Sequence, residues 1–309
     1  GRLRLRDVTH VVESVDVDGR RARLRVTGDY AIAGVRSTYE STHRVVAVRS
    51  GGRWRIRAVR GGRGLPPWEV AAFSERRTRH FVVLAPPAVQ VDELLPVLET
   101  GYERMREALS RGTLRRRYLV VVAADAGQAR SLTTDIRGVA ALAAISDATI
   151  REQGAEREVA EVISLRLLVV WPPFSALDAE DRGRVVAHEL THAALAGSTS
   201  GRTPAWLVEG LALYVSGDRR PASPGADLAA LSEPEAIARL SGEAQAAAYA
   251  TSAAAAFAIE ERFGHRRLLR LYDAFGDPEL EGPPGRRLVN RALRRELGIT
   301  LAELEAGLG

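Results

Sequence analysis

The chain has 309 residues, 46% of them hydrophobic, so it can bury a sizeable core and is not a disordered protein. It contains no cysteine, which excludes disulfides, thiolate nucleophiles and cysteine-held metal sites. All 44 basic residues are arginine, dispersed among 39 acidic residues, and the formal net charge is +5. Because a nucleic-acid-binding protein needs a basic stripe with interleaved aromatic residues, this pattern predicts no nucleic-acid partner.

Residues 3–61 alternate polar and apolar side chains, as half-buried strands do, in "RARLRVTGDYAI" (21–32), "STHRVVAVR" (41–49) and "RWRIRAV" (53–59). Asp18-Gly19 and Gly51-Gly52 stand where hairpin turns belong. We therefore predict an antiparallel β module over residues 1–62. Its pattern resembles part of an NTF2-like or cystatin-like domain, without the leading helix.

Glycine and proline cluster after this module and predict a linker over residues 63–74. Short apolar runs then predict buried strands at 80–87, 117–125, 138–145 and 162–171, with a helix over 91–112 between the first two. From Ala179 onward nearly everything has helical spacing. The predicted class is α+β, with a strand-rich lobe and a helical lobe over residues 75–309.

The segment "VVAHELTHAALAG" (185–197) predicts a helix from about Asp178 to Ala196, ended by Gly197 in the left-handed conformation. On it His188 and His192 lie ~40° apart around the axis and ~6 Å along it, so both can reach one metal ion. Glu189 is rotated by ~100°, close enough to contact a water activated by that metal. The alternative is a chance match in which the two histidines are simply packed or exposed.

A third ligand is predicted in "RTPAWLVEGLALYVSG" (202–217). Thr203 is a suitable N-cap and Pro204 suits the first helical position. Glu209 stands among apolar residues, where burial is costly unless the carboxylate is paired or binds a metal. The alternative is that Glu209 faces solvent. Gly210 beside it would let the two helices approach closely.

The pair of motifs resembles the gluzincin metallopeptidases, in particular peptidase MA-like domains related to aminopeptidase N-type and thermolysin-like enzymes. In the helix over 248–264 the spacing from Tyr249 to Gly264 is similar to that of aminopeptidase N-type enzymes. The resemblance implies Zn²⁺ bound by two histidines and a glutamate, a glutamate as general base and a tyrosine at the oxyanion, here His188, His192, Glu209, Glu189 and Tyr249. Two departures are a short gap between His192 and Glu209, and Leu213 where thermolysin-like relatives carry a supporting carboxylate. Asp181, Asp218 or a backbone carbonyl could support the histidines instead.

The predicted function is zinc-dependent peptide-bond hydrolysis, as an endopeptidase with a narrow range of peptide or protein substrates. The predicted strands carry no glutamate that would bind a free N-terminal amine, and "GVAALAAI" (138–145) would suit a peptide lying alongside. One alternative is a catalytically weak or inactive zinc-binding interaction protein on a peptidase fold. Another is an arginine-rich module for acidic surfaces, whose binding would depend strongly on salt.

The remaining histidines, His10, His43, His80 and His265, lack metal-ligand spacing and are predicted to be structural. No stretch reaches the ~18–20 apolar residues of a membrane span. The chain begins at Gly1 with a strand-like segment, which favours a removed signal peptide or anchor and an extracytoplasmic location. The oligomeric state is left open.

Overall fold

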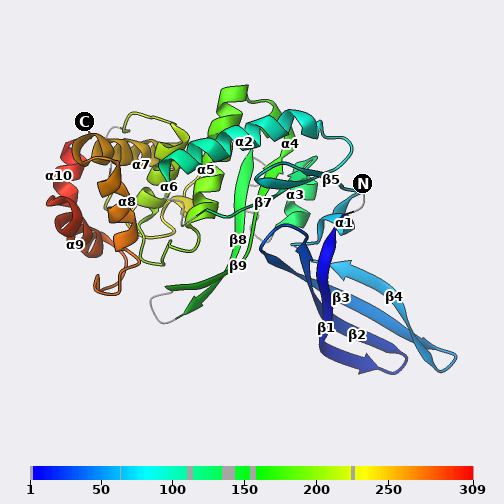
Figure 1. The fold of residues 1–309 in the computed structure, drawn as a ribbon. Helices are drawn as coiled ribbons and strands as arrows, with labels where there is room; N and C mark the ends of the chain where they lie inside the picture. The colour runs from blue at the N-terminus through cyan, green and yellow to red at the C-terminus, as the bar shows by residue number, and fades with distance from the viewer. Residues whose placement is uncertain are drawn as a thin grey trace. The chain divides into compact units, whose positions relative to one another are not determined.

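The computed structural model describes residues 3–62, 64–109, 114–133, 143–153, 158–223 and 227–308 (Figure 1). The chain is mixed α+β, with an antiparallel four-stranded sheet, a mixed five-stranded sheet and a series of helices, which confirms the predicted class. It forms two compact units. The first comprises Gly1–Glu99, Arg115–Thr149 and Ile163–Arg182, and the second comprises Thr100–Leu114, Ile150–Val162 and Gly183–Gly309.

The first sheet is the predicted meander, with its strands in chain order: β1 (Leu5–Asp18), β2 (Arg21–Ile32), β3 (Thr38–Ser50) and β4 (Arg53–Gly61). Each neighbouring pair is antiparallel. At the hairpins Gly19, Gly51 and Gly52 have φ of 54°, 56° and 77°, a region that glycine adopts without steric cost. Both predicted turns are thus confirmed.

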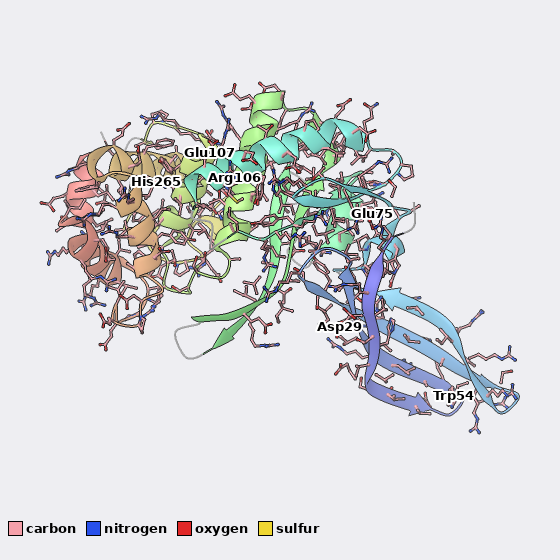
Figure 2. The ribbon with its side chains drawn as sticks, viewed as in Figure 1. Asp29, Trp54, Glu75, Arg106, Glu107 and His265 are labelled. Carbon is pink, nitrogen blue, oxygen red and sulfur yellow. The ribbon has the colours of Figure 1, made fainter. Side chains whose placement is uncertain are left out.

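One face of this sheet is apolar and only half covered. At one end the short helix α1 (Pro67–Val70) lies over it, where Trp68 meets Tyr30 edge-on and His43 contacts Glu69 at 2.8 Å. Over the other half, apolar side chains of the two edge strands are 43–69% exposed; Figure 2 labels one of them, and the set is Val12, Val15, Val17, Trp54, Ile56 and Val59. The register places all six on the face that carries Leu24 and Val45.

The second sheet has the order β5-β6-β7-β9-β8 and contains β5 (Ser74–Arg77), β6 (Phe81–Ala85), β7 (Tyr118–Ala123), β8 (Ala144–Gln153) and β9 (Glu158–Val170). β6, β7 and β9 are parallel, and β5 is antiparallel to β6. Every residue of β6 and β7 is buried, as expected of parallel strands covered on both faces. The strands predicted at 80–87, 117–125 and 162–171 are confirmed, whereas 138–142 of the fourth lie outside the described residues.

Both sheets of the first unit contribute to one hydrophobic cluster. Tyr30 and Ile32 come from the four-stranded sheet, and Leu84 and Val121 come from the five-stranded sheet. The antiparallel strands are therefore packed against the strands that follow them. The two compact units divide the chain differently from the predicted domains, 1–62 and 75–309, and those domain limits remain a prediction.

Helices follow from Trp171 to the end of the described chain: α4 (Trp171–Ser175), α5 (Ala179–Leu195), α6 (Ala205–Ser216), α7 (Gly242–Phe263), α8 (His265–Ala274), α9 (Arg286–Leu297) and α10 (Leu301–Ala306). Besides α1, the helices α2 (Val91–Ala108) and α3 (Ala126–Leu132) precede them, and a 3₁₀ turn covers Ile237–Arg239. Gly217, Gly264 and Gly298 end α6, α7 and α9 with φ of 74°, 85° and 74°. In the described part of the chain, no helix has the length and apolarity that a membrane crossing requires.

Two predicted helix ends are wrong. Gly197 does not take the left-handed conformation; instead the carbonyl of Leu195 accepts from the amides of Ser198 at 2.8 Å and Thr199 at 2.9 Å. Thr203 is not the N-cap of α6, because Pro204 is, with φ −67° and ψ 142°. The carbonyl of Pro204 accepts the first helical bonds, from the amides of Leu207 at 3.0 Å and Val208 at 3.1 Å, and the Thr203 hydroxyl accepts from the amide of Ser200 at 3.2 Å instead of from the first turn.

Candidate metal centre

α5 and α6 bring together the three predicted ligands. The Nε2 atoms of His188 and His192 lie 3.0 Å apart. The Oε2 atom of Glu209 lies 3.3 Å from the first and 3.4 Å from the second. Within the described residues this is the one group of at least three histidine or acidic side chains whose ligand atoms converge as a metal requires.

Two of the three separations match the edges of a small tetrahedron. Nitrogen and oxygen ligands bind zinc at about 2.0–2.2 Å, so two ligands of a tetrahedral ion lie about 3.3–3.6 Å apart. The distances from Oε2 of Glu209, 3.3 and 3.4 Å, lie in this range, whereas the 3.0 Å between the two imidazole nitrogens is shorter than such an edge. A bond between the two histidines alone would not bring the carboxylate oxygen equally close to both rings.

Burial gives an independent argument for a cation. The side chains of His188, His192 and Glu209 are 16%, 19% and 20% exposed. Oε2 of Glu209 is itself buried and has no hydrogen-bond donor in suitable geometry. A buried carboxylate oxygen without a donor is costly. A metal ion bound by the two imidazoles and this oxygen would satisfy it, so the residues present fit a cation that takes nitrogen and oxygen ligands.

The charges within the cluster are strongly coupled. Burial would lower the pKa of His192, but the carboxylates of Glu209 and Glu189 outweigh it and raise that pKa to about 9. Burial would raise the pKa of Glu209, but His192 and His188 hold it well below its usual range. The centre thus keeps Glu209 ionised and attracts a positive charge.

The packing of α6 explains where Glu209 points. Trp206, Leu207 and Leu211 of this helix are fully buried, so the carboxylate stands in an apolar surrounding, as the sequence predicted. A Cβ at Gly210 would lie 2.4 Å from the carbonyl oxygen of Ser252, on α7. The close approach predicted at Gly210 therefore occurs, but with α7 rather than with the helix that carries the histidines.

The helix α5, which carries the two histidines, packs closely against α2. A Cβ at Gly101 would lie 2.4 Å from a methyl of Val186, two residues before the first ligand histidine. At the end of α2 the carbonyl of Ala108 contacts Nε2 of His265 at 2.8 Å; Figure 2 labels this histidine beside Arg106 and Glu107. α2 thereby supports the helices that hold the centre.

Glu189 and Tyr249 share the electrostatic environment of the cluster. Burial, and then the charges of Glu209 and Glu189, raise the pKa of the Tyr249 hydroxyl, while Arg220 opposes the shift. Tyr249 therefore stays protonated and can donate a hydrogen bond throughout the neutral range. The roles of these two residues, inferred from the resemblance, remain predictions.

Arg220 lies near Tyr249, and nothing in the sequence indicated this. Its guanidinium binds both carboxylate oxygens of Asp218, at 3.1 and 2.5 Å. The hydrogen bond and charge of Asp218 raise the pKa of Arg220, and Tyr249 is near enough to add to this shift when its hydroxyl is ionised. No spacing rule links positions 220 and 249, so only the fold reveals this relation. Asp218, one of the supports considered for the histidines, is engaged by Arg220.

The other histidines have structural partners, in agreement with the prediction. His43 contacts Glu69 at 2.8 Å, and Nδ1 of His80 contacts Glu99 at 2.6 Å. Nδ1 of His265 contacts the hydroxyl of Tyr214 at 3.1 Å. His10 packs over Gly28, whose Cβ would lie 3.0 Å from its ring.

Neither protein-family models nor curated proteins yield a match to this chain. The resemblance to gluzincins therefore rests on the two motifs and on the geometry of their three ligand atoms.

Proposed function

We propose that the protein is a zinc metallopeptidase of gluzincin type, and that its second unit, together with the five-stranded sheet, corresponds to a zincin domain. The observation that carries the proposal is the convergence of His188, His192 and Glu209, whose ligand atoms lie 3.0–3.4 Å apart around a buried carboxylate oxygen. Two imidazoles and one carboxylate are a ligand set that suits catalytic zinc, which keeps a fourth position open. When bound, zinc would supply Lewis acidity toward a peptide carbonyl and toward water.

The remaining chemistry belongs to the chain's own residues. Glu189 follows the first ligand on α5 and is the proposed base, which accepts a proton from water and gives it to the leaving amine. Tyr249 is the proposed hydrogen-bond donor to the oxygen on which negative charge develops. Its raised pKa supports this role, because a phenolate could not donate.

The predicted strands upstream of the histidines carry no glutamate that would bind the free N-terminal amine of a substrate. We therefore propose that the enzyme is an endopeptidase with a narrow range of substrates. The sequence suggested that a strand of small apolar residues would bind a peptide alongside. The described edge strand β8 has instead the sequence "AISDATIREQ", which contains several polar and charged residues. Its Asp147 binds Arg166 at 2.9 Å and so does not offer a free carboxylate.

The test combines metal analysis with peptide cleavage. We expect about one zinc per chain in the wild type and almost none in His192→Ala, which loses one imidazole. With zinc, we expect the wild type to cleave N-acetylated, internally quenched peptides better than free-amine aminoacyl substrates. Absence of zinc from metal-replete wild type would overturn the proposal, and cleavage of free-amine substrates alone would overturn the endopeptidase part.

A zinc-binding protein without turnover is the second candidate. It is favoured by one observation, the leucine at position 213 in place of a carboxylate that would support a ligand histidine. Stoichiometric zinc together with no cleavage of a diverse peptide library would select it.

A further inference from the structure

The face of the four-stranded sheet opposite the apolar one carries a row of arginines. Residues two apart in a strand share a face, so Arg21, Arg23 and Arg25 of β2 lie on the same side. Arg25 stands opposite Arg44 of β3, which in turn stands opposite Arg60 of β4. Arg25, Arg44 and Arg60, here called the arginine row, thus cross three neighbouring strands.

The sheet does not neutralise this row. On the β1 side Arg25 faces Ser14, and the nearby Asp16 pairs instead with Arg23, at 3.4 Å. Throughout the described residues, the arginine row has no ion-pair partner. Like charges placed directly opposite each other destabilise a sheet, so the row is unfavourable until an anion lies across it.

The arginine row lies in a hollow of about 980 Å³. The same hollow is lined by three more arginines, Arg21, Arg23 and Arg57, and by one carboxylate, that of Asp16. Neighbouring strands are about 4.8 Å apart, so the row alone spans about 10 Å. This exceeds one small anion and matches a ligand that carries several anionic groups.

We propose that this hollow binds an acidic polypeptide segment. Guanidinium groups pair with carboxylates through two parallel hydrogen bonds, and an extended chain can present a carboxylate at every second residue. Single-stranded nucleic acid is disfavoured because Tyr30, Tyr39 and Trp54, the aromatic residues of these strands, all lie on the opposite face. A lipid bilayer is disfavoured because the surface is hollowed rather than flat.

The inference concerns the first unit alone and does not depend on the metal centre. It assigns the four-stranded sheet a docking role that would operate whether or not the chain is an enzyme. Because the attraction is electrostatic, binding should weaken as salt rises.

The experiment measures fluorescence anisotropy of a labelled oligoglutamate peptide with the full chain at low salt. The test variant is Arg25→Gln/Arg44→Gln/Arg60→Gln. The matched control is Arg286→Gln/Arg287→Gln/Arg294→Gln, which removes the same charge from another arginine-lined hollow, of about 480 Å³, on α9. We expect the test variant to bind at least about tenfold more weakly and the control to stay within about twofold of the wild type.

Folding of the test variant is checked by thermal melting, which should be unchanged or higher because like charges have been removed. Equal loss of binding in both variants, or in neither, would overturn the assignment to the hollow. Tighter binding of oligothymidylate or of anionic vesicles than of oligoglutamate would overturn the ligand class. Failure of the wild type to bind oligoglutamate would overturn the proposal as a whole.

Discussion

Glu189 is the proposed general base beside the candidate metal centre. Its charge contributes to the raised pKa values of both His192 and Tyr249. Replacing it with glutamine keeps the shape but removes the proton acceptor. We therefore expect Glu189→Gln to retain zinc and to lose about 10²–10⁴-fold in kcat.

The measurement pairs elemental analysis with a peptide cleavage rate on the same sample. The control is Glu180→Gln, also on α5 and within its first turn, which should leave both quantities unchanged. A fully metallated Glu189→Gln protein with the wild-type rate would remove Glu189 from the mechanism.

Tyr249 is the proposed hydrogen-bond donor to the oxyanion, and its substitution tests that role. Burial and the neighbouring carboxylates keep its hydroxyl protonated, so it can serve as a hydrogen-bond donor but not as a base. If it donates to the developing oxyanion, Tyr249→Phe should lower kcat by roughly 10²-fold and change KM little. Steady-state kinetics on a quenched peptide separates the two constants, and a rise in KM with unchanged kcat would show that Tyr249 only binds substrate.

His192 would make binding of the proposed metal depend on pH. In the metal-free chain its pKa is raised to about 9, so at pH 7 the imidazole carries a proton that a metal must displace. Zinc affinity should thus increase about tenfold per pH unit as pH rises toward 9, and then level off. Calorimetry at pH 7 in two buffers of different ionisation enthalpy should show about one proton released, and no buffer dependence would contradict this protonation state.

At the level of elements, the α6–α7 contact fixes where Glu209 stands. A methyl at Gly210 would meet the backbone of Ser252 at 2.4 Å, and backbone does not yield as a flexible side chain does. We expect Gly210→Ala to lower the free energy of unfolding by about 1–3 kcal/mol, although alanine is the better helix former. Gly183→Ala on α5 is the matched control: a Cβ there has no neighbour within 4 Å, so it should stabilise by about 0.4–1 kcal/mol.

Chemical denaturation of the two variants beside the wild type measures both effects. Opposite signs are the expected result. Equal stabilisation by both substitutions would show that α6 and α7 can separate without cost.

The elements that sequence predicted well are those whose pattern is local. Period-two alternation located β2, β3 and β4, and helical spacing located α2, α5, α6 and α7, because side-chain periodicity depends only on neighbours along the chain. The helix ends at Gly197 and Thr203 were wrong because local residue preference was overruled by carbonyl and hydroxyl contacts in the turn between α5 and α6. Strand order and parallel pairing, as in β7 beside β9, depend on tertiary contacts and could not be predicted.

At the candidate site too, the sequence predicted what depends on local spacing and not what depends on tertiary contacts. Helical spacing alone placed His188 and His192 on one face, and the apolar surroundings indicated Glu209. Spacing could not show that Oε2 of Glu209 lies 3.3 and 3.4 Å from the two rings, because that depends on how α6 returns past α5. The relation of Arg220 to Tyr249 left no signal in the sequence at all.

On the scale of the whole molecule, the two proposed binding sites lie in different compact units. The three candidate ligands belong to the second unit, whereas the arginine row belongs to the first. The first unit also exposes an apolar half-face, from Val12 to Val59, on the sheet that carries the row. Loss of one binding property therefore does not imply loss of the other, and each can be tested with the other as a control.

Zinc should stabilise the second unit selectively. A ligand that binds only the folded state adds RT ln(1 + [L]/Kd), about 2.7 kcal/mol at one hundred times Kd. His188 and His192 are on α5 and Glu209 is on α6, so this free energy acts first on those helices and on α7, which packs against Gly210. We expect zinc to slow amide hydrogen exchange in peptides from α5, α6 and α7, and to leave those from β1 to β4 unchanged. Exchange mass spectrometry with and without zinc, with His192→Ala as the control, measures this. Equal slowing in the four-stranded sheet would show that metal binding stabilises both units together, and unchanged exchange in α5 and α6 would contradict the metal centre itself.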